Sequence, residues 1–274
     1  MIKRLMELGV IVEPEAVGLL EKGDADSIAE HLLKMRPMPL TINAELAKKL
    51  LAEDAKPKLL KRVSEMKEMS MPDFAAGYNE RYSALQRLLL KNPALGGAVS
   101  IASATGECSI IGMVKNGGKT IEDPSGEGTL VADAKLYDGD VIGAIGTAAN
   151  GVFKAREIFF PNVQLKERRE ACGTVTAGAG GDIKTDATAF YDVNGAVIAV
   201  SHAILSKEEA LELLKRRHLT VPPKDVLEPQ PDILIFNSKE NFTETFKGIL
   251  LVGIKDGTRA EIDVGARGAR FAQL

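Results

Sequence analysis

The chain contains three histidines, His31, His202 and His218, and these are its first candidates for metal-dependent chemistry. Hydrolysis of a phosphodiester at a two-metal centre needs imidazole and carboxylate ligands that converge on ions about 3.5–4 Å apart. His202 follows a buried strand that we expect at 196–200. His31 lies among predicted N-terminal helices, and His218 lies in an Arg-Arg-His-Leu stretch that indicates a structural role. Histidines dispersed in this way do not supply a two-metal ligand set.

Carboxylates that could complete such a site are equally dispersed. Asp192, Asp232 and Glu240 could each act as an isolated metal ligand, but three scattered acids do not form one site. We therefore interpret them as surface carboxylates. The sequence predicts no catalytic residue, no metal site and no cofactor.

Two glycine-containing stretches resemble phosphate-binding loops without meeting their requirements. Residues 113–120, Met-Val-Lys-Asn-Gly-Gly-Lys-Thr, have methionine where a Walker A loop needs glycine, and Ile-Glu-Asp-Pro follows where a helix should begin. A β-hairpin turn is the preferred interpretation. Residues 178–181, Gly-Ala-Gly-Gly, have neither a preceding predicted strand nor the full dinucleotide-binding fingerprint, so we expect a flexible link there.

Basic residues of a predicted barrel could contact nucleic-acid phosphates, and they are Lys115, Lys119, Lys154 and Arg156. The alternative is ordinary solvated charge, and both interpretations stay open. Proteins that bind single strands also use stacking aromatic rings. The candidates here, some of which must belong to the core, are Tyr137, Phe153, Phe159 and Phe160. The basic run at 215–217 ends a predicted helix, where we expect it to be solvated and to complement the helix dipole.

Composition limits the classes of protein to be considered. The 274 residues are 45% hydrophobic and carry a formal net charge of −3, so the chain can bury a core but has no overall attraction for nucleic acid. Its two cysteines, Cys108 and Cys172, form neither a zinc pattern nor a disulfide framework, which favours a cytoplasmic location. No apolar run has membrane-spanning length, and we expect no membrane contact.

The elements that must position these residues predict a multidomain α+β chain. Residues 1–53 predict short helices, with Pro14 opening one and Asn43 capping another, and residues 54–97 predict a charged linker and a helix ahead of the barrel. Short β-type runs separated by turn signals, among them Asn150-Gly151, predict a small β-barrel at 98–163. We expect a flexible link at 164–188 and a reduced α/β domain at 189–274, with strands at 196–200, 233–236, 248–254 and 260–264.

Five stretches, taken in chain order, carry a family resemblance. They are Asp-Phe-Ala-Ala-Gly-Tyr-Asn-Glu-Arg-Tyr-Ser-Ala-Leu at 73–85, Ser-Ile-Ile-Gly-Met-Val at 109–114, Glu-Asp-Pro-Ser-Gly at 122–126, Glu-Ile-Phe-Phe-Pro-Asn-Val at 157–163 and Pro-Asp-Ile-Leu-Ile-Phe at 231–236. Together they resemble the small subunit of archaeal D-family DNA polymerases. The resemblance implies a helical docking module, an OB-fold barrel and a calcineurin-like phosphoesterase domain. That last domain is much longer in the family, so here it would be a shrunken α/β remnant.

The resemblance also bears on the candidate site residues. In that family the strand after Pro-Asp leads into a Gly-His-x-His metal motif. Ser238 and Glu240 stand where the two histidines would be, and His202 would be the relic of one metal-site histidine. The resemblance therefore implies a subunit whose phosphoesterase or exonuclease site is inactive.

Such a subunit would serve DNA replication as a scaffold. It would bind the large catalytic polymerase subunit, contact DNA weakly and dock other replication proteins through its N-terminal helices. With most of the phosphoesterase domain missing, we expect strands such as 248–254 to have few neighbours in the isolated chain. Two alternatives remain open: a stand-alone OB-fold protein that binds single-stranded DNA, and a minimal phosphoesterase with a rearranged metal site.

Overall fold

The computed structural model describes residues 2–21, 23, 25–35, 37–53, 56–63, 71–167, 171–220 and 226–273. The fold divides into two compact units. The sandwich unit comprises Met1–Val63, Leu165–Lys207 and Pro229–Leu274, and the barrel unit comprises Ser64–Gln164 and Glu208–Glu228. Each unit is therefore assembled from separate stretches of chain. No helix within the described ranges is long and apolar enough to cross a membrane.

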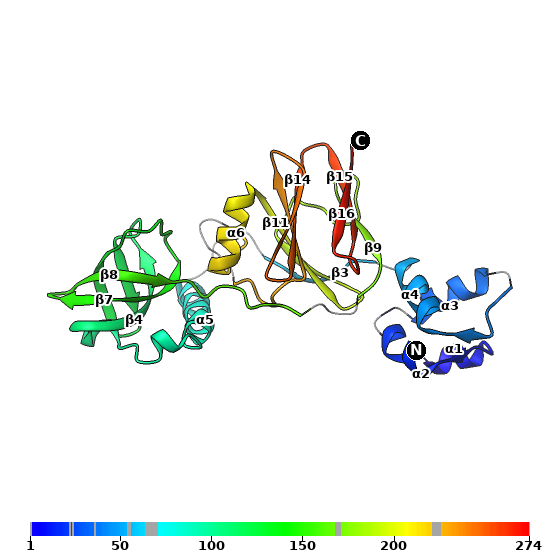
Figure 1. The fold of residues 1–274 in the computed structure, drawn as a ribbon, viewed down its shortest axis with the longest axis horizontal. Coiled ribbons are helices and arrows are strands. Elements are labelled where there is room, and N and C mark those ends of the chain that lie inside the picture. Colours follow the sequence, from blue (N-terminus) through cyan, green and yellow to red (C-terminus); the bar gives the residue numbers. More distant parts are fainter. Residues whose placement is uncertain are drawn as a thin grey trace. The chain divides into compact units, whose positions relative to one another are not determined.

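Short helices open the sandwich unit (Figure 1), namely α1 (Ile2–Glu7), α2 (Pro14–Leu20), α3 (Ala25–Lys34) and α4 (Ala44–Glu53). Two short parallel strands accompany them, β1 (Ile11–Val12) and β2 (Thr41–Ile42). The helices form a core of their own, which includes Leu5, Leu20, Leu32 and Leu50. Pro14 occupies the first position of α2, and the Asn43 side chain caps α4 by accepting from Leu46 N at 2.9 Å. Both features confirm predictions from the sequence.

The larger layer of the sandwich unit is a six-stranded sheet in the order β13-β14-β12-β11-β10-β3. Its strands are β3 (Lys58–Arg62), β10 (Ala189–Val193), β11 (Ala196–Ile204), β12 (Ile233–Ser238), β13 (Phe242–Phe246) and β14 (Ile249–Lys255). Strands β11, β12 and β14 run parallel to one another, whereas β3, β10 and β13 pair antiparallel with their neighbours. The continuous apolar runs predicted the buried central strands correctly, because a strand covered on both faces needs apolar side chains throughout.

Strand β14 corrects the expectation that 248–254 would have few neighbours. It pairs with β12 on one side and with β13 on the other, and all its residues except Lys255 are buried. Strand β13 was not among the strands predicted from the sequence. Its alternating Phe-Thr-Glu-Thr-Phe pattern forms a half-exposed strand that covers the edge of β14.

A second sheet of three strands shares a core with the first. Its order is β16-β15-β9, and its strands are β9 (Thr174–Gly178), β15 (Thr258–Asp263) and β16 (Gly268–Gln273). Core side chains from both sheets include Val175, Ile198, Val252 and Ile262. The C-terminal region is therefore a β-sandwich of two layers.

Strand β9 lies inside 164–188, where the sequence predicts a flexible link. Val175 and Ala177 are fully buried and alternate with two threonines, which is the period of a strand with one buried face. Gly178 has a φ of 91°, and a Cβ added at Gly181 would lie 2.9 Å from the Ala177 backbone. These glycines allow the backbone to pack closely. Composition alone does not distinguish a closely packed glycine-rich segment from a flexible one.

Strand β3 lies inside the charged segment for which the sequence predicts a linker. It pairs antiparallel with β10, which follows far later in the chain. Residues 54–55 and 64–70 of that segment lie outside the described residues. The strand depends on pairing with β10, which is distant in the sequence, so the charged local sequence did not predict it.

The barrel unit contains a closed five-stranded barrel in the order β4-β5-β6-β8-β7. Its strands are β4 (Gly106–Lys115), β5 (Thr120–Asp123), β6 (Gly126–Val131), β7 (Val141–Ala149) and β8 (Val152–Phe159). Asn150 and Gly151, with φ of 50° and 74°, form the β7–β8 hairpin turn as predicted. Residues 116–119 form the β4–β5 turn, which confirms the hairpin interpretation of the Walker A-like stretch.

The barrel unit also contains the α-helices α5 and α6 and two short 3-10 helices, η1 (Pro93–Leu95) and η2 (Ile101–Ser103). Helix α5 (Met71–Leu89) shares a core with the barrel, which includes Tyr82, Leu85, Leu89, Ile111 and Met113. The Tyr82 hydroxyl donates to Ile111 O at 3.1 Å, and burial raises the pKa of Tyr82 to about 12. Helix α6 (Lys207–Arg216) belongs to this unit from Glu208 onward.

Candidate functional site

The sandwich unit contains a groove of 310 Å³ at the carboxyl ends of β12 and β14. Proteins with parallel strands commonly bind ligands at this end of the sheet. The loop after β9 forms one wall and the β14–β15 turn forms another. The lining residues are 178–181, 184–186, 237 and 254–258.

The three expected remnants of a metal site, His202, Ser238 and Glu240, lie at or just beyond the carboxyl ends of β11 and β12. Asn237 joins these strand ends, because its side-chain amide donates to His202 O and to a second carbonyl, each at 3.0 Å. The His202 ring is exposed, with Nδ1 2.7 Å from Thr188 Oγ1. Ser238 is buried, whereas Glu240 is exposed.

These residues do not fit a two-metal hydrolytic centre. Such a centre needs imidazole and carboxylate ligands that converge on the ions. Within the described ranges, no three His, Cys, Asp or Glu side chains are close enough together to hold a metal ion. Ser238 offers only a neutral hydroxyl, and Nδ1 of His202 is already in contact with a hydroxyl.

Asp232 precedes β12, at the opposite end of the strand from Glu240, and it is buried. This corrects its interpretation as a surface carboxylate. Its carboxylate lies 3.0 Å from Lys166 Nζ and 2.9 Å from Arg267 Nη2, and accepts from Val197 N at 2.9 Å. Two cations and a backbone donor offset the cost of burying its charge. Asp232 therefore holds the amino-terminal ends of the strands together.

The groove at the strand ends has mixed charge, contributed by Lys184, Asp186, Lys255 and Asp256. Its glycine-rich wall is not a phosphate cradle, because such a cradle needs several free backbone amides. Ala179 N donates to Thr258 O at 3.2 Å, and Gly181 N donates to Gly178 O at 3.1 Å. The groove thus offers polar contacts without an arranged anion site.

On the barrel, two of the four basic candidates are engaged by carboxylates. Lys115 Nζ lies 2.5 Å from a Glu122 oxygen and 5.1 Å from the centre of the Tyr78 ring. Arg156 Nη1 lies 3.2 Å from a Glu107 oxygen. Their positive charges are therefore partly neutralised within the barrel unit.

The other two candidates, Lys119 and Lys154, lie beside the end of β6. Leu130 N donates to Lys119 O at 2.8 Å, and Val131 is opposite Lys154 in the β6–β8 ladder. Both lysines are exposed, and neither has an ion pair with a described residue. Val131, which is 49% exposed, lies between them.

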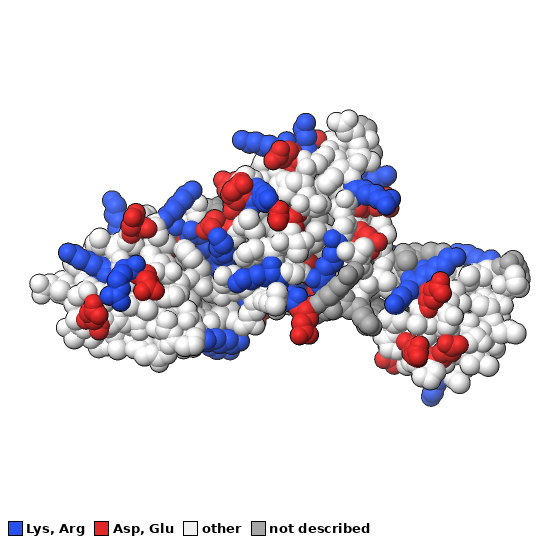
Figure 2. Space-filling view, in the orientation of Figure 1, with Lys and Arg blue, Asp and Glu red and all other residues white. Residues whose placement is uncertain are grey.

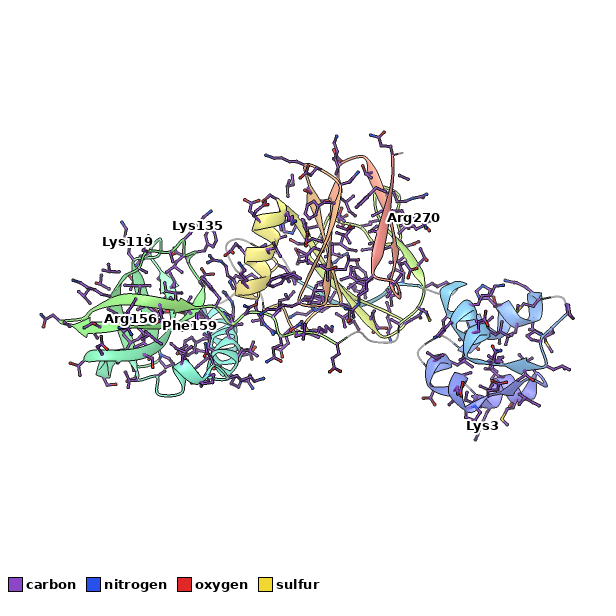
Figure 3. All side chains as sticks on the ribbon, viewed as in Figure 1. Lys3, Lys119, Lys135, Arg156, Phe159 and Arg270 are labelled. Carbon is purple, nitrogen blue, oxygen red and sulfur yellow. The ribbon has the colours of Figure 1, made fainter. Side chains whose placement is uncertain are left out.

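Lys135 is a third cation at this end of the barrel, and sequence reasoning missed it. Its neighbour Leu136 lies over the β4–β5 turn, because a Cβ added at Gly118 would be 3.5 Å from Leu136 Cβ. Figure 3 shows Lys119 and Lys135 projecting from the same side of the barrel unit. We call Lys119, Lys135 and Lys154 the β6 patch. Figure 2 shows basic and acidic side chains interspersed over the visible face, the barrel unit included.

The basic run at 215–217 was expected to be a solvated helix end, and this is wrong for two of its members. Arg216 and Arg217 are 4% and 5% exposed, and the following His218 is 1% exposed. Arg216 forms an ion pair with Asp140, and its guanidinium lies 4.4 Å from the centre of the Phe160 ring. The helix dipole explains why cations end α6, but the partner that buries Arg216 is 76 residues earlier in the chain.

Burial lowers the pKa of His218 to about 4, although its hydrogen bond with Asp140 opposes this shift. His218 Nε2 lies 3.1 Å from Asp140 Oδ1, and Arg81 Nη2 lies 3.4 Å from His218 Nδ1. Arg81 also donates to Gly139 O. The cluster joins α5, the 138–140 turn and the end of α6, and its burial indicates a structural role.

The aromatic candidates offer little open stacking surface. Phe153 is buried in the barrel core, and the Tyr137 and Phe160 rings are covered by the Arg216 guanidinium at 4.8 and 4.4 Å. Phe159 is half-buried (Figure 3) and lines a second groove, of 440 Å³, between the end of α5 and the end of β8. Three of the four rings are thus accounted for by packing.

Comparison with known proteins gives a partial match. No protein-family model matches the chain. The chain is 35% identical over 119 residues to the DNA polymerase II small subunit of Methanothermobacter thermautotrophicus. The match covers 36% of this chain and 25% of that protein, so the chain spans about a quarter of the length of this curated relative.

Proposed function

We propose that this chain is a non-catalytic accessory subunit of a DNA polymerase of the archaeal D family. The observation that carries the proposal is the 35% identity, over 119 residues, to a DNA polymerase II small subunit. The stretches at 109–114 and 231–236, which resemble D-family small subunits, support the same assignment. Its work would be to bind and stabilise the large catalytic subunit.

In this proposal the barrel is an OB-fold, a small five-stranded barrel that often binds oligonucleotides. The closed order β4-β5-β6-β8-β7 supports that assignment. The sandwich would be the reduced phosphoesterase-like domain. The parallel strands β11, β12 and β14, with a groove at the carboxyl ends of the latter two, support this part of the proposal.

The sandwich would have lost hydrolytic activity and kept a scaffolding role. The separate environments of His202, Ser238 and Glu240 favour this over the alternative of a minimal phosphoesterase. A hydroxyl and an exposed carboxylate beside one imidazole do not make a two-metal ligand set.

DNA contact would be weak and electrostatic, through the β6 patch. The alternative of a stand-alone single-strand-binding protein needs aromatic rings on which bases stack. Phe153 and Phe160 are committed to packing, which favours the accessory role.

The N-terminal helices would dock other replication proteins. Their own core supports an independent module, and the side chains of Ile11 and Leu40, which are 66% and 75% exposed, offer it an apolar docking surface. Ile11 and Leu40 are neighbours, because Ile11 N donates to Leu40 O at 2.8 Å.

Co-purification tests the proposed function. A tagged copy of the chain is co-expressed with the large D-family polymerase subunit of the same organism, with the large subunit of an unrelated polymerase as control. We expect a complex that survives affinity and size-exclusion chromatography with the first partner and none with the second. Failure to form that complex, when both chains are folded, would contradict the accessory role.

A further inference from the structure

Strand β3 is an outer strand of the six-stranded sheet (Figure 1), and β10 is the one described strand that pairs with it. All five of its residues are exposed. Two of them are leucines, Leu59 and Leu60, with exposed fractions of 50% and 47%. The strand at the other edge, β13, alternates exposed and half-buried residues. The β3 edge is therefore the less covered of the two.

The ladder between β3 and β10 leaves part of the β3 backbone pointing outward. Arg62 is opposite Ala189, and the next residue, Val63, donates to Thr188 O at 2.9 Å. Hydrogen-bonded and non-hydrogen-bonded pairs alternate along an antiparallel ladder, so the Arg62 N–H and C=O point away from β10. Among the described strands, only β10 pairs with β3. Arg62 therefore offers one backbone donor and one backbone acceptor to an incoming strand.

The side chains of β3 are basic as well as apolar. Lys58, Lys61 and Arg62 are exposed, and none has an ion pair with a described residue. Lysine on an edge strand commonly protects a protein against edge-to-edge association. Protection alone does not account for Leu59 and Leu60, whose exposed apolar surface favours contact. The combination fits a partner strand of opposite charge.

A second copy of this chain is poorly matched to the edge. Antiparallel pairing of two β3 strands about Leu60 would set Lys58 opposite Arg62. Like charges directly opposite each other destabilise a strand pair. An acidic strand would instead place carboxylates beside these cations.

We propose that β3 binds an extended acidic segment of a partner protein, which joins the sheet as an additional strand. In this mode of recognition the backbone hydrogen bonds supply affinity and the alternate side chains supply specificity. The inference goes beyond the proposed polymerase function and does not rest on it, because its test uses no polymerase component.

Peptide binding to the full chain tests this proposal. The probe is a fluorescent heptapeptide of alternating glutamate and valine, and the comparison is a heptapeptide of alternating lysine and valine. We expect fluorescence anisotropy to show saturable binding of the acidic peptide and at least about tenfold weaker binding of the basic one. Absent or equal binding of the two peptides would overturn the proposal.

Variants of Arg62 separate the backbone contribution from the charge. Arg62→Ala removes the side-chain charge, and Arg62→Pro removes the outward N–H as well, which an edge strand tolerates. We expect the proline variant to bind the acidic peptide at least about fivefold more weakly than the alanine variant. Circular dichroism spectra that match the wild type would show that both variants fold. Equal affinities of two folded variants would exclude strand addition at this edge.

Charge reversal provides a second, independent measurement. The double variant Lys58→Glu/Lys61→Glu should lose at least about tenfold in affinity for the acidic peptide. Lys48→Glu/Lys49→Glu on α4 makes the same change in net charge at two exposed positions and should change affinity by less than about twofold. Similar losses in both double variants would indicate general charge attraction and overturn the proposal. Concentration-dependent dimers that Arg62→Pro abolishes would also overturn the proposal, because the strand bound at β3 would then come from a second copy of this chain.

Discussion

His218 Nε2 lies 3.1 Å from Asp140 Oδ1, although 78 residues separate the two positions in the chain. The other oxygen of the same carboxylate accepts from Arg216. One buried acid therefore contacts both a permanent cation and an ionisable ring. This arrangement keeps the imidazole neutral in the folded protein, because burial outweighs the attraction of the carboxylate for a proton.

The first prediction concerns the dependence of stability on pH. The folded pKa of His218, about 4, lies below its ordinary value of 6.5, so the unfolded chain binds a proton that the folded chain excludes. The contribution of neutral His218 to the free energy of unfolding is therefore complete above pH 6.5. It is lost as the pH falls towards 4, which lowers the free energy of unfolding by up to about 3 kcal/mol at 1.36 kcal/mol per pKa unit. Asp140, Arg81 and Arg216 are the charged groups that face the ring.

Urea denaturation of the full chain between pH 7 and pH 4 measures this effect. His218→Gln should show a shallower loss of unfolding free energy than the wild type, because glutamine binds no proton. His202→Gln is the matched control, since His202 is exposed, and it should retain the wild-type slope. Identical slopes for all three proteins would contradict the assignment.

The second prediction concerns the buried ion pair. Asp140→Ala should lower the free energy of unfolding of the barrel unit by about 3–5 kcal/mol, because it leaves the Arg216 charge buried without a partner. Asp133→Ala, at an exposed position in the same region, should change it by less than about 0.5 kcal/mol. Chemical denaturation followed by circular dichroism compares the two. A small effect of Asp140→Ala would mean that Arg216 reaches solvent.

These contacts show where sequence reasoning succeeds and where it stops. Local signals predicted the Asn43 cap, the Asn150-Gly151 turn and the apolar central strands, because each depends on a few neighbouring residues. The burial of Arg216 depends on Asp140, and no local pattern connects them. For the candidate site, the sequence placed His202 at a strand end but did not show what its ring contacts.

The third prediction tests whether the glycine-rich stretch at 178–181 is packed. Gly181→Ala should destabilise the sandwich unit by about 1–3 kcal/mol, because the added Cβ would lie 2.9 Å from the Ala177 backbone. Gly18→Ala in α2 has open space and should be neutral or stabilising by up to about 1 kcal/mol. Thermal denaturation of both variants gives the comparison. No loss of stability in Gly181→Ala would restore the interpretation as a flexible link.

The fourth prediction concerns hydrolysis. The purified chain should show no manganese-dependent cleavage of single-stranded DNA above the background of a mock purification, because Ser238 and Glu240 do not complete a two-metal ligand set with His202. His202→Ala and His31→Ala are prepared alongside the wild type. Turnover that disappears in the first variant and persists in the second would establish a rearranged metal site.

The fifth prediction concerns DNA binding at the β6 patch. Lys119→Gln/Lys154→Gln should weaken binding to oligothymidine and reduce the slope of log affinity against log salt by about one unit for each phosphate that the variant no longer neutralises. Lys115→Gln/Arg156→Gln removes the same charge from positions already paired with Glu122 and Glu107, and should have a smaller effect. Fluorescence anisotropy over a range of salt concentrations distinguishes them. Equal effects would show that the barrel attracts DNA only through its overall charge.

The division of both units over separate stretches of chain has a consequence for biosynthesis. On the ribosome, β3 emerges long before β10, the strand with which it pairs, so the N-terminal part of the sheet waits for residues 189–193. The barrel strands are complete at Phe159, yet Asp140 meets Arg216 only after α6 has been translated. Long-range pairing of this kind delays folding and leaves strand edges uncovered in the meantime. A ribosome-bound chain that stops before β10 would therefore display β3 without its partner strand and Asp140 without Arg216. Chaperones would have most reason to bind the nascent chain during the time between the synthesis of β3 and the synthesis of α6.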